Sequence, residues 1–249
     1  MKSIRGERGS RSRSWRSSLA WKAVGPGTLW AVVVSCAGQA GVVTGGAVSP
    51  EARSALLLEP AHEEWRRPAP AVSRLRFETT QGVFALALIR AWGPIGADRL
   101  YNLARLGYYD DTRFHRVNAN YIAQFGLHGD PAVNAAWKDR YLADDPPRSR
   151  NARGSFAFAM KGQPDTRNTQ IYINLADNVR SDAEAFTILG TVVEGMDVVD
   201  RLYSGYGENS GSGVRQGRQG PLESGGNAYM DREFPRLDRI LRVTVTAVR

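Results

Sequence analysis

The sequence contains a single cysteine, Cys36, and only three histidines in 249 residues. One cysteine excludes an internal disulfide, and the absence of HExxH and CxxC spacing disfavours a zinc site, so we predict neither a metal nor a cofactor. A GxSxG nucleophile turn between a strand and a helix is also absent. The glycine-rich region 204–227 lacks the GxxxxGK[ST] spacing of a phosphate-binding loop and is expected to be a flexible surface loop.

Acidic residues are nearly missing from residues 1–22, which hold seven Lys or Arg and only one acid, Glu7. This basic arm supplies +6 of the total net charge of +8, and the remaining residues contain 26 bases against 24 acids. The positive charge is therefore concentrated outside the expected folded part. We predict that the folded part does not bind nucleic acid.

Residues 23–48 form an uncharged stretch of 26 residues that follows the basic arm. A basic region, an apolar region and small residues near Ala40 are typical of an export signal. The stretch also exceeds the ~20 residues that an uncleaved membrane anchor needs. If the source is a bacterium, Cys36 in the sequence VVSC resembles the acylated cysteine of a lipoprotein; otherwise it is a small residue within the signal.

We therefore expect residues 1–48 to be an export signal or membrane anchor and residues 49–71 to be a linker. The protein is expected to be exported, either periplasmic or tethered to a membrane and facing away from the cytoplasm. In a eukaryotic source, the long arm rich in Arg and Ser would instead favour an organelle transit peptide.

Residues 72–249 are expected to form one mainly β domain. The segment RLRFETTQGVFALALI predicts a hairpin, and five further strands are expected at TRFHRV, YIAQFG, GSFAFAM, QIYINL and FTILGTVVEG, before a final strand in RLDRILRVTVTAV. Two helices are expected, one with Ile95, Leu100, Leu103 and Leu106 at helical spacing and one in MDVVDRLYS. Together they predict a closed, eight-stranded antiparallel β-barrel capped by two α-helices.

Period-two alternation sorts the polar residues of these strands into faces. Arg116 lies opposite to its neighbour His115, which we expect to be a structural residue rather than a catalytic base. Alternation alone does not place these strands side by side. If their outer faces meet, polar side chains surround an apolar shelf; the set comprises Arg116, Gln124, Gln170 and Tyr172 around Ile122 and Ala159.

Four ordered motifs resemble those of the cyclophilins, a family of peptidyl-prolyl cis–trans isomerases. They are FHRVNANYIAQFGLHGDP, RGSFAFAM, NTQIYINLADN and FTILGTVVEGMDVVDRL, and they lie between about residues 75 and 202. The resemblance implies that the protein is a peptidyl-prolyl isomerase acting on proline-containing polypeptides. It is expected to be a monomer that assists the folding of exported proteins, and a membrane tether through its N-terminal segment is one of the outcomes left open above.

The resemblance also implies which side chains form the site. The catalytic arginine of the family falls on Arg116, expected to be exposed in a groove, and the glutamine that binds the substrate falls on Gln124. The implied substrate-binding residues are Tyr121, Ile122, Ala159, Met160, Gln170, Tyr172 and Phe186.

Three features depart from the family pattern. Both pocket aromatics are tyrosines, the segment QFGLHGDP contains an insertion, and Arg180 and Ser181 stand where an apolar pair is common. One wall of the proline pocket is therefore expected to be thin or polar. The alternative function that these departures favour is a proline-peptide-binding chaperone module on the same fold, with weak or no turnover.

Overall fold

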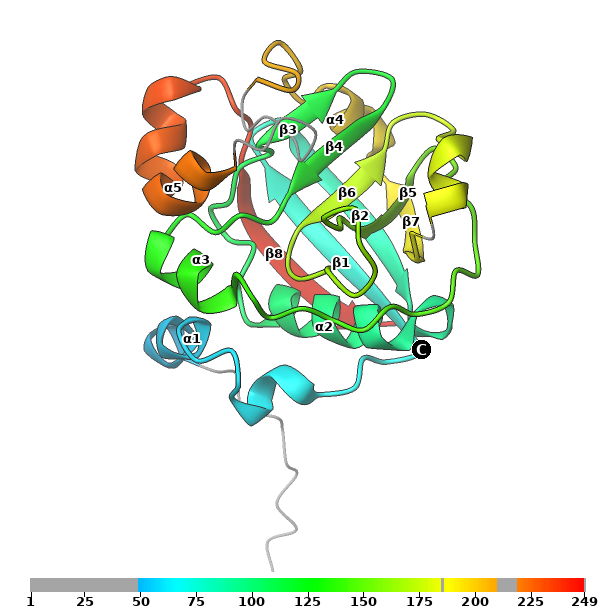
Figure 1. Cartoon of the computed structure of the whole chain (residues 1–249), viewed down its shortest axis with the longest axis horizontal. Helices are drawn as coiled ribbons and strands as arrows, with labels where there is room; N and C mark the ends of the chain where they lie inside the picture. Colours follow the sequence, from blue (N-terminus) through cyan, green and yellow to red (C-terminus); the bar gives the residue numbers. More distant parts are fainter. Residues whose placement is uncertain (1–48, 185, 210–218, 249) are drawn as a thin grey trace, which may run out of the picture. The chain divides into compact units, whose positions relative to one another are not determined.

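An antiparallel sheet of eight strands dominates the computed structural model, which describes residues 49–184, 186–209 and 219–248. The strands lie in the order β3-β4-β6-β5-β7-β2-β1-β8, and Figure 1 shows the sheet strongly curled. Their bounds are β1 Val72–Thr79, β2 Gly82–Ile89, β3 Arg116–Asn118, β4 Ile122–Phe125, β5 Ser155–Phe158, β6 Ile171–Asn174, β7 Ile188–Glu194 and β8 Ile240–Ala247. Each of the expected strands is present within a few residues.

The prediction of a closed barrel is wrong, because the sheet stays open between its edge strands β3 and β8. In the described part of the chain, a single bridge between Arg113 and Arg239 spans this gap. Strand β3 has only three residues, and its Val117 forms a bridge with Gly207 instead of pairing with β8. A short strand whose free edge is occupied by another segment cannot extend a ladder along the eight residues of β8.

The concave side of the sheet holds the main hydrophobic core. Aromatic side chains fill it, with Phe77 stacked on Phe84 at 4.8 Å between ring centroids and Phe125 edge-on to Phe77 at 5.6 Å. On β3, the side chain of Val117, which follows Arg116 in the sequence, belongs to the same core. Since alternate residues of a strand point to opposite faces, the neighbours Arg116 and Gln124 are directed to the convex side.

The expected two helices are present, but the described residues contain five α-helices, so that part of the prediction is wrong. Helices α2 Pro94–Arg105 and α4 Met196–Asp200 match the expected pair, and Figure 1 shows them at opposite ends of the curled sheet. Helices α1 Pro50–Leu57, α3 Pro131–Trp137 and α5 Gly220–Glu233 were not expected. Among the described helices, none is long and apolar enough to cross a membrane.

Helix α5 overlaps the glycine-rich region that was expected to be a loop. The three glycines of this helix make its sequence atypical of a helix. Gly226 adopts φ 54 and ψ −148 at an internal kink. Packing compensates, because Leu222 and Met230 of α5 bury against Leu127 in a small separate core. The residue Leu127 lies in the insertion of QFGLHGDP, so this insertion supports the added helix.

The segment predicted to be a linker, residues 49–71, packs against the domain. Trp65 is buried and meets Trp137 edge-on at 4.7 Å between ring centroids. The Nε1 of Trp137 donates to the carbonyl of Leu57 at 2.8 Å, which joins α3 to the end of α1. The short 3-10 helix η1, Glu63–Arg66, carries Trp65, so one buried indole attaches to the domain a segment whose proline and charge content suggested a linker.

The N-terminal predictions concern residues outside the described part of the chain. They comprise the export signal or anchor over residues 1–48 and the acylation of Cys36, which remain expectations from the sequence.

Candidate active site

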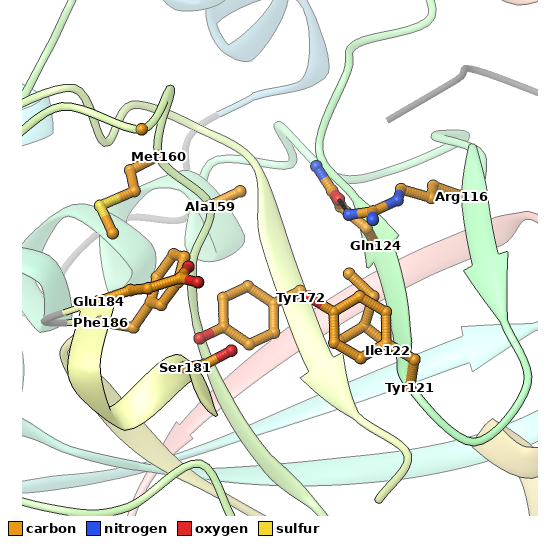
Figure 2. Close-up of a pocket in the computed structure, with 11 residues that line it drawn as sticks. Arg116, Tyr121, Ile122, Gln124, Ala159, Met160, Tyr172, Ser181, Glu184 and Phe186 are labelled. Carbon is orange, nitrogen blue, oxygen red and sulfur yellow. Dashed lines mark hydrogen bonds between the residues drawn. The ribbon is translucent and has the colours of Figure 1, made fainter. Parts of the chain in front are cut away.

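A pocket opens on the convex side of the sheet, across strands β4, β5 and β6. Its volume is about 220 Å³. Eight of the nine site residues named from the sequence line it: Arg116, Tyr121, Ile122, Gln124, Ala159, Met160, Tyr172 and Phe186. Figure 2 shows Arg116 and Gln124 on one side, Tyr172 in the middle and Phe186 opposite. Antiparallel register brings them together, because Gln124 pairs with both Arg116 and Tyr172 across neighbouring strands.

Hydrogen bonds hold the Arg116 guanidinium in place. The prediction that this side chain is exposed in a groove is wrong. Only 6% of the residue surface is accessible. Its Nη1 donates to Gln124 Oε1 at 3.0 Å, and its Nε and Nη2 donate to the two carboxylate oxygens of Glu208 at 2.8 and 2.6 Å. The guanidinium also lies 5.7 Å from the centre of the Tyr121 ring. The pocket therefore has a permanently charged, oriented donor at its edge.

The floor of the pocket is apolar. Ile122, Ala157, Tyr172 and Ile188 form a small buried cluster of their own, against which Phe186 packs. The Tyr172 ring meets the Phe186 ring edge-on at 5.3 Å. Such an enclosed aromatic and aliphatic surface suits a small saturated ring better than a charged group.

The hydroxyl of Tyr172 does not make this floor polar. It donates to Asn151 Oδ1 at 2.7 Å, and Asn151 is buried outside the lining of the pocket. Burial raises the pKa of the Tyr172 phenol well above its ordinary value, so the group is neutral at physiological pH. The tyrosine thus offers its ring to the pocket and satisfies its hydroxyl elsewhere.

Comparison with known families gives a match to the cyclophilin-type peptidyl-prolyl cis–trans isomerase domain over residues 74–218, more than half of the chain. The chain belongs to the cyclophilin family. It is therefore an isomerase of X–Pro peptide bonds, as the sequence motifs predicted.

Curated relatives of this cyclophilin come from bacteria and eukaryotes. A peptidyl-prolyl cis-trans isomerase of Acinetobacter baylyi is 30% identical over 139 residues, which cover 54% of this chain and 73% of the relative. The peptidyl-prolyl cis-trans isomerase-like 1 of Bos taurus is 30% identical over 143 residues, covering 56% and 82% of the two chains.

Solved structures agree with this cyclophilin in fold. A Cryptosporidium parvum cyclophilin-type isomerase superposes with a TM-score of 0.52 at 19% identity, covering 72% of this chain and 99% of that chain. Its structure in the presence of the dipeptide Ala-Pro gives a TM-score of 0.51 at 18% identity and covers 70% and 99%.

One wall of the pocket in this cyclophilin is polar. Ser181 and Glu184 line it from the 3-10 helix η3, Val179–Glu184. Both residues, together with Tyr121, also border an adjoining hollow of about 490 Å³, which Arg180 lines as well. With serine instead of an apolar residue at position 181, the pocket adjoins a second, more polar depression.

Gln170 lies in a different place than the sequence predicts, and two residues next to the pocket, Gln219 and Glu208, were not predicted. Gln170 is not among the described residues that line the pocket, but its Oε1 accepts from Gln124 Nε2 at 2.8 Å. Gln219 lies next to it, since Gln170 Nε2 donates to Gln219 Oε1 at 3.0 Å. Glu208, at the other end of this polar row, carries no sequence signal beyond its place in the glycine-rich region.

His115 lies in the interior and does not line the pocket. Its burial, and secondarily the positive charge of Arg116, lowers the pKa of His115 from 6.5 to about 4. A neutral, enclosed imidazole at physiological pH fits the structural role expected from strand alternation. Within the described residues, no three His, Cys, Asp or Glu side chains gather in a group that could hold a metal ion.

Proposed function

We propose that Arg116 and Gln124 catalyse the isomerisation of X–Pro bonds in exported polypeptides, with the apolar pocket gripping the prolyl ring. The observation that carries this proposal is the oriented guanidinium at the rim of an apolar pocket. The family membership supplies the reaction, while the role of each side chain and the choice of clients are inferences from the site and the sequence.

The reaction needs no covalent chemistry. An X–Pro bond rotates slowly because the amide nitrogen shares its lone pair with the carbonyl, giving a barrier of ~18–20 kcal/mol. A catalyst must bind the twisted amide more tightly than either planar form. In the twisted amide the nitrogen lone pair is localised, so a charged N–H donor beside the ring stabilises it selectively.

The side chains around the pocket fit the other requirements. Tyr121, Ile122, Tyr172 and Phe186 surround the space where a prolyl ring would lie. Gln124 uses one acceptor position for Arg116 and one donor for Gln170, which leaves a further N–H to hold the substrate carbonyl. If the held carbonyl is that of the proline itself, the ring and this carbonyl lie on the same side of the X–Pro bond, and the segment before the proline is left to rotate.

Replacement of Arg116 tests the catalytic proposal. In a protease-coupled isomerisation assay of the purified protein, Arg116→Ala should lower kcat/KM by about 100-fold, the effect of removing one donor to a transition state, about 3 kcal/mol. Arg116→Lys should also be impaired, because an ammonium cannot reproduce the planar fork. Rates must be normalised to folded protein, since the buried side chain also supports the structure.

The matched control for this experiment is Arg113. It is equally buried, with 3% of its surface accessible, and it binds the carboxylate of Asp231 through two nitrogens, but it does not line the pocket. Arg113→Ala should cost stability while leaving kcat/KM per folded molecule near normal. Near-normal turnover in Arg116→Ala would refute the catalytic proposal.

The polar wall favours one alternative, a proline-peptide-binding module with weak turnover. Ser181 and Glu184 leave the prolyl ring less enclosed than an apolar wall would. A protein that binds proline peptides but does not accelerate isomerisation in the same assay would support this alternative.

The export proposal rests on the basic arm and the uncharged stretch of residues 23–48. Cleavage near Ala40 would give a free domain, acylation of Cys36 a tethered one, and an intact segment an anchored one. The mass of the native protein's N-terminal peptide distinguishes these outcomes, and intact protein in a cytosolic soluble fraction would contradict all three.

A further inference from the structure

The segment that follows α4 places an acidic residue beside the catalytic arginine. After α4 ends at Asp200, the chain returns along the free edge of β3, where Gly207 forms a bridge with Val117. Strand alternation then brings the next residue, Glu208, level with the outward-facing Arg116. This stretch belongs to the glycine-rich region, for which the sequence predicts a surface loop, and the family motifs end before it, at residue 202.

The contact between Glu208 and Arg116 is bidentate and largely shielded from water. Both carboxylate oxygens accept from the guanidinium, at 2.8 Å from Nε and 2.6 Å from Nη2. The Arg116 side chain is 7% exposed and that of Glu208 26%. Asn118 Nδ2 donates to the same carboxylate, so two residues of β3 fix its orientation. Parallel paired hydrogen bonds of this kind set the plane of a guanidinium as well as its charge.

This ion pair ends a continuous row of hydrogen bonds across the convex face. Arg116 donates to Gln124, Gln124 donates to Gln170, and Gln170 donates to Gln219, over distances of 3.0, 2.8 and 3.0 Å. These contacts use three of the five guanidinium N–H groups. Of the two that remain, one belongs to Nη1 and one to Nη2.

We propose that Glu208 is the positioning residue for Arg116 in the isomerisation reaction. It binds the Nε side of the guanidinium, fixes the plane of the fork, and so leaves one N–H of Nη1 and one of Nη2 for the twisted amide. The proposal depends on the catalytic role of Arg116.

The opposite role, in which Glu208 blocks the arginine, does not fit the geometry. Among the described residues that line the pocket the acid is Glu184, not Glu208. Glu208 therefore contacts the guanidinium from outside the space that the substrate would fill. An inhibitory acid would have to compete with the substrate within that space.

Substitution of Glu208 separates positioning from simple stabilisation. Glu208→Ala should lower kcat/KM by about 10-fold, the cost of a loosely held catalytic group. The loss should fall mainly on kcat, because the arginine contact strengthens only in the twisted state. Glu208→Gln keeps one acceptor and should lose less, so activity should follow the order wild type, Gln, Ala.

Asp231→Asn provides the control, because Asp231 makes the same two-nitrogen contact with the buried Arg113 away from the pocket. If Glu208 merely stabilises the fold, both substitutions should lower the melting temperature and leave kcat per folded molecule unchanged. Faster turnover in Glu208→Ala would instead reveal an inhibitory acid. Either result overturns the proposal.

A double substitution tests the coupling directly. In an Arg116→Ala background, Glu208→Ala should cause no further loss of kcat/KM, because the group that it positions is gone. A further 10-fold loss would mean that Glu208 acts independently and would overturn the proposal. Normal activity in Arg116→Ala would refute the catalytic proposal for Arg116. Normal activity in Glu208→Ala together with a loss in Arg116→Ala would refute only the positioning role of Glu208.

Discussion

The buried histidine should make stability depend on pH, and we expect it to take no part in catalysis. His115 has no accessible surface, and its enclosure lowers its pKa to about 4, against 6.5 for an exposed imidazole. Above pH 6.5 the imidazole is neutral in both the folded and the unfolded chain, so it contributes no pH dependence there. Between pH 6.5 and 4 the unfolded chain binds a proton that the folded chain does not, so stability falls as the pH falls.

The size of this loss follows from the two pKa values. Each tenfold difference in proton affinity corresponds to ~1.4 kcal/mol, so His115 should remove about 3 kcal/mol of unfolding free energy by pH 4. Other groups add their own slopes: burial lowers the pKa of His128, which acts in the same direction, and raises the pKa of the Asp110 carboxyl, which acts in the opposite one. The difference between wild type and a His115 variant isolates the contribution of His115.

Urea unfolding of wild type and His115→Gln from pH 8 to pH 4 measures that difference. The variant should start less stable at pH 8, because it perturbs a packed site, and the gap should shrink by about 3 kcal/mol on approach to pH 4. Its kcat per folded molecule should keep the wild-type pH profile. Parallel stability curves would refute the linkage, and a titration of kcat that vanishes in the variant would make His115 an acid–base catalyst.

Two further substitutions test the parts of the structure that the family motifs do not cover. If residues 49–71 belong to the folded domain, Trp65→Ala should lower the unfolding free energy by about 3–5 kcal/mol, as truncation of a buried aromatic does. An unchanged urea midpoint would instead support the prediction that this segment is a linker. Ser181→Leu should lower KM for proline peptides by about 3- to 10-fold through added apolar contact in the pocket. Val179→Leu, in the adjoining hollow, is its control. An equal decrease in KM for both variants would show that the effect is not specific to the pocket wall at Ser181.

The convex-face site could be predicted because it depends on strand alternation. Positions 116, 124 and 172 are outward on three neighbouring strands, and the antiparallel register sets them side by side. The family motifs supplied the order of the strands, which period two alone leaves open. Both kinds of information concern short stretches, where local pattern decides which face a side chain occupies.

The Glu208 contact could not be predicted because it joins residues 92 positions apart. Glycine-rich sequence indicates where a chain turns, but gives no information on which strand edge it will follow. The expected exposure of Arg116 failed for the same reason, since its burial depends on the segment that carries Glu208. Helix α5 was missed because its glycines lower helix propensity, whereas tertiary burial of Leu222 and Met230 stabilises it.

The alternation of β3 and β4 also predicts how substitutions should divide between stability and activity. Val117 and Phe125 point into the main core, so changes there should unfold the protein with little specific effect on kcat. Their neighbours on the convex face should alter the reaction with less effect on folding. Arg116 is the exception, because it is both the proposed catalytic donor and half of a shielded ion pair. Removing it takes the guanidinium partner away from the shielded Glu208 carboxylate, so activity and stability should fall together at this position, whereas they separate elsewhere on the same strands.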